Sequence, residues 1–167
     1  MAETVKQYVR RILGYVEGHD PLAVQQATPR RLARLIRGRS RAQLARRPAP
    51  GRWSVAEVLA HLAESEMVAG YRLRMILSAN GTAIQAFDQD KWAKVGKYAR
   101  QDPKQSLEMF STLRRSNLAL LRSLQPRQWR MYGIHSERGR ETVARIATMF
   151  AGHDINHTRQ IEKVLRG

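Results

Sequence analysis

Three long stretches of the chain carry apolar side chains at the spacing of an α-helix. Over residues 54–80, 103–125 and 139–165, apolar residues recur three or four positions apart, which would place them along one side of a helix. The stripe positions are Val55, Val58, Leu62, Ala69, Leu73 and Ile76, then Leu107, Phe110, Leu113, Leu118, Leu121 and Leu124, then Val143, Ile146, Phe150, Ile161 and Val164. Strand-type alternation is sustained nowhere. Long helices with one apolar side must pack on one another, so the pattern predicts an all-α fold.

The N-terminal third of the chain divides into two shorter helical segments. Residues 4–18 carry apolar positions at helical spacing and predict the first. Thr28 before Pro29 is typical of an N-cap followed by proline at the first helical position, so we expect the second helix to begin there. The segment 48–51, with the sequence PAPG, would end it.

Together these segments predict a four-helix bundle with an accessory N-terminal helix, built by residues 1–167 as one domain. With 43% hydrophobic residues the chain can form one continuous core. The connection over residues 81–102 contains Phe87, Asp88, Asp90 and Trp92, and we expect no regular element in it. The two aspartates are expected to cap a helix or stabilise a turn, and a position over the mouth of a functional site is the alternative.

No apolar run approaches the ~20 residues needed to span a bilayer, and the N-terminus lacks the pattern of a secretory leader. We therefore expect a soluble, cytoplasmic protein without a membrane partner. The sequence contains no cysteine, which excludes disulfides, thiolate metal sites and a thiol nucleophile from the protein itself. A bound metal would have to be held by His, Asp or Glu.

The formal net charge is +16, and much of it lies in one arginine-rich segment. No acidic residue occurs between Asp20 and Glu57, whereas residues 30–52 contain nine arginines, namely Arg30, Arg31, Arg34, Arg37, Arg39, Arg41, Arg46, Arg47 and Arg52. Such a segment could attract a polyanion or form a solvated helix face. No aromatic residues interleave with these arginines to stack on bases, so we favour the solvated face and expect no specific nucleic-acid partner.

Three histidines are the candidates for a metal site. His153 and His157 lie four residues apart, about 40° from each other on a helical wheel, on the side of the apolar stripe. His61, at the edge of the stripe over residues 54–80, can point into the same interior. Each could instead be a hydrogen-bonded core residue, but two adjacent imidazoles in a core need either a shared ligand or separate polar partners. Three neutral imidazoles would hold a divalent ion and leave coordination positions open.

Other polar residues could support such a site. Asp154 lies about 100° from His153 on the wheel, where it could accept the second N–H of a ligand histidine. Glu57 and Glu64, on either side of His61, are interpreted as a helix cap and a solvated face. His19 and His135 lie in loop-like contexts and are expected at the surface or behind the ligands.

The sequence resembles the DinB superfamily, also known as DinB/YfiT-like metal-dependent enzymes. The resemblance is carried by PGRWSVAEVLAHLAESE over residues 50–66, FDQDKWA over 87–93 and GRETVARIATMFAGHDINHTRQI over 139–161. It implies a divalent metal, zinc or nickel in most members, held at the positions of His61, His153 and His157. It also implies chemistry with a low-molecular-weight thiol such as mycothiol, bacillithiol or glutathione, because better-understood members are S-transferases and isomerases of this kind. The family name refers to induction by DNA damage, which concerns expression and not chemistry.

Our leading hypothesis is a thiol-dependent S-transferase in which the metal activates an external thiol for attack on a small electrophile. Arg72 and Arg159 are candidates for binding the carboxylates of the thiol. A metal-dependent hydrolase that activates water is the second possibility, and a non-enzymatic basic binding module is the third. The expected partner is a small molecule, and a homodimer is left open.

Overall fold

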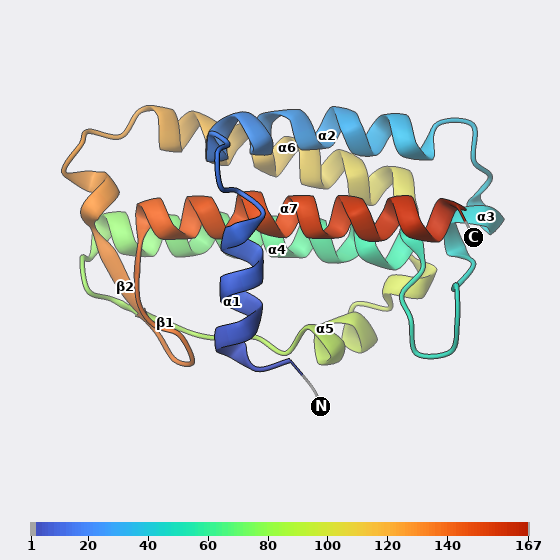
Figure 1. Cartoon of the computed structure of the whole chain (residues 1–167), viewed down its shortest axis with the longest axis horizontal. Coiled ribbons are helices and arrows are strands. Elements are labelled where there is room, and N and C mark those ends of the chain that lie inside the picture. Colours follow the sequence, from blue (N-terminus) through green and yellow to red (C-terminus); the bar gives the residue numbers. More distant parts are fainter. Residues whose placement is uncertain (1–2, 167) are drawn as a thin grey trace.

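Four long helices lie alongside one another in the computed structural model, which describes residues 3–166 (Figure 1). They are α2 (Pro21–Ile36), α4 (Val55–Ser78), α6 (Pro103–Arg122) and α7 (Val143–Arg166). Helix α4 packs mainly on α6 and α2 mainly on α7, with further contacts between α2 and α6 and between α4 and α7. The predicted four-helix bundle is confirmed. No helix within the described residues is long and apolar enough to cross a membrane.

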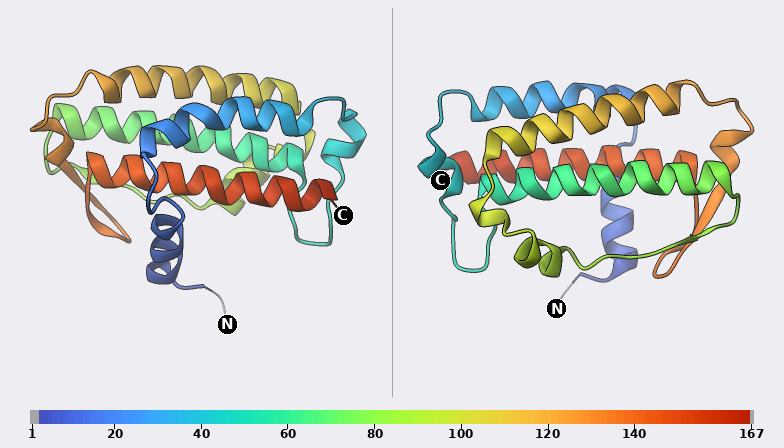
Figure 2. Two further views of the ribbon diagram at one scale, coloured as in Figure 1. Left: turned by 45° about the horizontal axis from the view of Figure 1, so that its top comes forward. Right: turned by 180° about the vertical axis from the view of Figure 1, so that it is seen from behind.

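The connection between α4 and α6 determines how the bundle is threaded. Helices α4 and α6 run in one direction, and α2 and α7 run in the other (Figure 2). Two neighbouring parallel helices need a connection that returns along the bundle, and the chain between Ser78 and Pro103 provides it. The accessory helix α1 (Val5–Gly14) crosses α7, while the short α3 (Arg41–Ala45) lies at the end where the chain terminates (Figure 1).

Helix α2 begins earlier than the sequence indicated. It follows directly on its N-cap, Asp20, so the expectation that Thr28 caps a helix starting at Pro29 is wrong, and Pro29 lies inside the helix. Proline has no N–H, which leaves the carbonyl of Gln25, four residues earlier, without its helical donor. A guanidinium N–H of Arg114 on α6 donates to that carbonyl at 3.0 Å. A tertiary contact therefore supplies the hydrogen bond that the proline cannot make.

The connections contain more regular structure than expected. The first holds β1 (Ala83–Ile84), α5 (Gln89–Val95) and the 3₁₀ helix η1 (Tyr98–Arg100), and the second holds η2 (Gln128–Arg130), β2 (Tyr132–His135) and β3 (Gly139–Thr142). β1 pairs in parallel with β2, which pairs antiparallel with β3. The expectation of no regular element over residues 81–102 was therefore wrong. Strands of two to four residues are too short to show a period of two, so the sequence pattern did not reveal them. Asp88 caps α5, in line with the capping interpretation.

Two apolar clusters fill the bundle interior and a polar layer separates them. Leu32, Leu59, Phe110 and Ile161 belong to the first cluster, and Leu73, Ile76, Leu121 and Ile146 belong to the second. Between these positions along the helices lie buried polar residues, including Glu66, Arg114, Asn117 and Asp154. His153 and His157 lie between the two clusters along α7, whereas His61 lies between Leu59 and Leu62 of the first cluster on α4.

Candidate metal centre

Three histidines meet where α4 packs on α7. Nε2 of His61 lies 3.0 Å from Nε2 of His153, and the three ring centres are 4.3 to 5.0 Å apart. One ring nitrogen from each residue, including His157, lies within 4.8 Å of the others. His61 and His157 are buried and His153 is half-buried. The structure thus brings together the three residues that the sequence singled out as ligands.

A close helix crossing lies beside this cluster. A Cβ added to Gly152 would come within 2.1 Å of the carbonyl oxygen of Ile12, so a glycine is required for α1 to cross α7 at this distance. The crossing places the start of α1, including Tyr8, over the cavity next to the histidines. The accessory helix is therefore part of the site as well as of the bundle.

Burial keeps the three imidazoles neutral. It lowers the pKa of His157 to about 4, and it lowers the pKa values of His61 and His153 well below the ordinary range, with a further contribution from the neighbouring rings. Nδ1 of His157 lies 2.8 Å from Oε1 of Gln160. Because that oxygen accepts, the proton lies on Nδ1 and the lone pair of Nε2 is available to a ligand.

The donor set fits a divalent metal ion. Nitrogens about 2.0–2.1 Å from a tetrahedral zinc would be about 3.3 Å apart, close to the 3.0 Å between the Nε2 atoms of His61 and His153. Nickel also accepts imidazole ligands. Within residues 3–166 the converging group consists of the three histidines alone, so a fourth position would remain open. Open positions are typical of catalytic sites, whereas structural zinc sites have four protein ligands.

A cavity of about 340 Å³ opens onto the cluster, and its wall includes His61 and His153. The rest of the wall is formed by charged, polar and apolar side chains, namely Glu3, Thr4, Val5, Tyr8, Ser65, Arg72, Phe87, Gln89, Glu137, Arg138, Met149 and Phe150. Arg72 is only 6% exposed, and burial lowers its pKa to about 10, which leaves it charged at neutral pH. Its Nη2 donates to the carbonyl of Gln85 at 2.6 Å, but it forms no ion pair with any described residue. Arg138, by contrast, pairs with the buried Glu141 through two hydrogen bonds.

The family model for the DinB superfamily matches residues 25–161. The chain belongs to this superfamily. Similar curated proteins carry provisional names as metal-dependent hydrolases. One from Oceanobacillus iheyensis is 28% identical over 116 residues, covering 70% of this chain and 67% of its own. YfiT from Bacillus subtilis is 25% identical over 146 residues, covering 87% and 82%.

The solved structure of YfiT, which is described as having an unusual four-helix bundle topology and the same provisional activity, superposes with a TM-score of 0.82. The match covers 99% of this chain and 89% of YfiT at 23% identity. At this identity the likeness supports the fold.

In this member of the DinB superfamily, Asp154 has a different partner from the one predicted. Both of its carboxylate oxygens accept hydrogen bonds from the buried Arg114, and none of its described contacts is to a histidine. Arg114 also donates to Glu66 at 2.7 Å. A guanidinium in the bundle interior requires counter-charges, and this requirement takes Asp154 away from the cluster. The residue that hydrogen-bonds a histidine of the group is Gln160, whose position three residues after His157 was the available sequence signal.

The remaining candidates divide between the site and the rest of the molecule. Arg72 lines the histidine cavity, but Arg159 is exposed, lies 4.4 Å above the ring of Tyr15 and lines a different cavity. His135 is buried in β2, so a surface position was wrong, and its pKa is lowered by burial first and then by Arg138 and Arg72, two residues that line the cavity. His19 is exposed, as expected.

The two glutamates beside His61 are less exposed than the solvated-face interpretation implied. Glu57 caps α4 as predicted, but it is buried and also binds Arg47. Glu64 is half-buried and accepts a hydrogen bond from the hydroxyl of Tyr98. Neither contributes an oxygen to the histidine group.

Proposed function

We propose that His61, His153 and His157 hold one divalent ion, zinc or nickel, and that the chain is a metal-dependent S-transferase that uses an external thiol. The observation that carries this proposal is that three neutral imidazoles meet beside a cavity that can admit a small molecule. The ion, when bound, supplies a Lewis acid that lowers the pKa of a thiol or water held next to it.

The residues of the cavity have distinct parts in this proposal. Gln160 holds His157 in the tautomer that ligates through Nε2. Arg72 offers a buried positive charge without an ion-pair partner, which suits the carboxylates of thiols such as glutathione or bacillithiol. The thiol proton would pass to solvent in the cavity, and the sulfur would bond to an electrophilic carbon as the bond to the leaving group breaks. The nucleophile must be external because the chain contains no cysteine.

A metal-dependent hydrolase is the second candidate. The provisional names of the relatives from Oceanobacillus iheyensis and Bacillus subtilis favour it. The same cavity would then hold a substrate with a carbonyl or phosphoryl group, with water as the nucleophile. Arg72 would bind an anionic group of that substrate instead of a thiol carboxylate.

A spectroscopic titration separates the two candidates. Adding glutathione, bacillithiol or mycothiol to cobalt-substituted protein should produce a sulfur-to-metal charge-transfer band, since a thiolate would join the histidines. Arg72→Gln should weaken the apparent affinity for glutathione without loss of cobalt, whereas Arg115→Gln, an exposed residue of α6, should not. If no thiol alters the spectrum and ester or amide substrates are cleaved only by metal-loaded protein, the hydrolase assignment replaces the transferase.

A further inference from the structure

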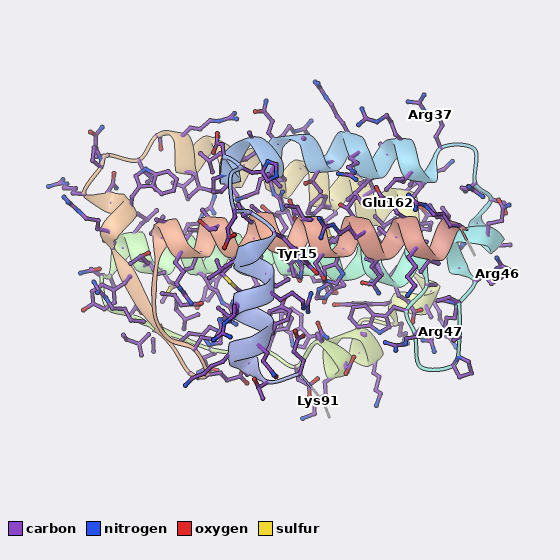
Figure 3. The ribbon with its side chains drawn as sticks, in the orientation of Figure 1. Tyr15, Arg37, Arg46, Arg47, Lys91 and Glu162 are labelled. Atoms are coloured by element: carbon purple, nitrogen blue, oxygen red, sulfur yellow. The ribbon has the colours of Figure 1, made fainter. Side chains whose placement is uncertain are left out.

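A second and larger cavity lies at the end of the molecule formed by α3, the loop before α4 and the last turns of α7. Its volume is about 1010 Å³, and none of the histidines of the cluster lines it. Figure 3 shows Arg46 and Arg47 at this end, beside α3 and the C-terminal part of α7. Six cationic side chains line the cavity, and no Asp or Glu does so among the described residues. The six are Arg39, Arg46, Arg47, Arg52, Arg159 and Lys163.

Most of these positive charges have no counter-charge. Arg47 binds Glu57, but the other five form no ion pair with any residue between 3 and 166. Like charges around a concave surface repel one another and concentrate the field within it, so a bound anion would relieve the repulsion. A single carboxylate would neutralise one of the five. The number of unpaired cations therefore indicates a ligand with several negative charges, such as a chain of phosphates, which arginine binds through paired hydrogen bonds.

Aromatic and apolar side chains complete the lining. Trp53 and Tyr15 face the cavity together with Pro48, Val164 and Leu165. The sequence argument that no aromatic residue accompanies the arginines therefore does not hold in three dimensions, since the fold brings Tyr15 from the end of α1 to Arg159. A mixed lining of this kind suits a small molecule with a charged end and a planar or apolar body.

We infer that this cavity binds a small molecule that carries a di- or triphosphate on a planar body, which is the chemistry of a nucleotide. The inference does not depend on the proposed function of the histidine site. The two sites nevertheless share a wall. The ring of Trp53 lies 5.1 Å from that of His61, and Gln160, which also lines the cavity, binds His157. An occupant would therefore contact side chains that pack against or orient the histidines.

Calorimetric titration of the full chain, stripped of metal by a chelator and dialysed, tests the inference. ATP and pyrophosphate should each bind at about one per chain, ATP more tightly, whereas adenosine should show no saturable binding. The combined change Arg39→Gln, Arg46→Gln and Arg52→Gln should weaken ATP binding at least about tenfold. A matched control, Arg115→Gln, Arg127→Gln and Arg130→Gln, removes the same charge from exposed positions outside the cavity and should change the affinity less than about twofold.

The three cavity arginines and the three control arginines are all exposed, and circular dichroism verifies that both triple variants fold. Absence of saturable binding by ATP and pyrophosphate would overturn the inference. Equal losses in the two triple variants would overturn it too, because the affinity would then reflect overall charge. A single-stranded DNA of about 20 nucleotides that binds more tightly than ATP and displaces it would assign the surface to nucleic acid instead.

Discussion

Nε2 of His61 lies 3.0 Å from Nε2 of His153, although the two residues are 92 positions apart in the chain. Two neutral imidazoles at this distance either share one proton or share a positively charged ligand. His157 adds a third ring on the same side, and no acidic residue among those described is part of the group. The shared-ligand alternative leads to the first prediction.

Protein prepared without chelator should contain about one divalent ion per chain, measured by elemental analysis. His157→Ala should lose most of the metal while its helical circular dichroism stays nearly unchanged, since the two apolar clusters of the bundle do not include this residue. His19→Ala, at an exposed position, is the control and should retain metal. Metal far below one equivalent that added zinc or nickel does not restore would contradict the site.

Gln160 should matter to the metal through His157. Gln160→Leu removes the acceptor that holds the proton on Nδ1, and we expect metal affinity to fall about 10–100-fold in competition with a chromophoric chelator. Gln160→Glu retains an acceptor and should bind metal at least as well as the unaltered chain. Equal affinities for all three proteins would show that Gln160 does not orient the ligand.

His135 should make metal-free protein less stable in mild acid. Burial, aided by Arg138 and Arg72, lowers its pKa from 6.5 to about 4 in the folded state. Between these values the unfolded chain binds more protons, so its contribution is present above pH 6.5 and is lost as the pH falls towards 4, by about 1.4 kcal/mol per pH unit.

Urea unfolding in the presence of chelator, repeated across this pH range, measures that slope. His135→Asn keeps a hydrogen-bond acceptor for the N–H of Glu137 but cannot be protonated, so its slope should be shallower by about the contribution of one group. Identical slopes for the two proteins would assign the acid sensitivity to other residues.

Arg114→Met should destabilise the fold severely. The change leaves the carboxylates of Asp154 and Glu66 buried without a counter-charge, and the carbonyl of Gln25 without a donor. We expect a loss of roughly 3–5 kcal/mol in the free energy of unfolding, measured with chemical denaturant. The neighbouring Arg115→Ala, on the exposed face of α6, should cost less than about 0.5 kcal/mol. A small effect of Arg114→Met would mean that the bundle interior tolerates the two acids by protonating them.

Replacing the whole buried group with apolar residues provides a further check. Arg114→Met combined with Asp154→Leu and Glu66→Leu should recover much of the stability lost in the single variant, because no unpaired charge then remains inside. If the triple variant is as unstable as Arg114→Met alone, the loss comes from packing and from the carbonyl of Gln25.

The sequence by itself determined the features that depend on neighbouring residues. The period of the apolar stripes predicted the three long helices α4, α6 and α7, and the capping box of Ser54 and Glu57 marked the start of α4. The four-residue spacing of His153 and His157 was enough to place both rings on one face, since helix geometry alone decides that proximity. Family membership followed from the same local segments.

Only the tertiary structure decided the features that depend on which helices pack together. The local sequence at Pro29 predicts the start of a helix. The proline is tolerated inside α2 because Arg114 of α6 donates to the carbonyl of Gln25, which lacks its helical donor. Asp154 binds that same guanidinium and not a histidine, although the histidines of α7 are nearer in the sequence, because the buried positive charge of Arg114 must be neutralised. The meeting of His61 with α7, and of Tyr15 with the arginines of the second cavity, also arises from packing between distant segments. The apolar stripe indicated only that His61 can face the interior, and for Tyr15 the local residue pattern carried no signal.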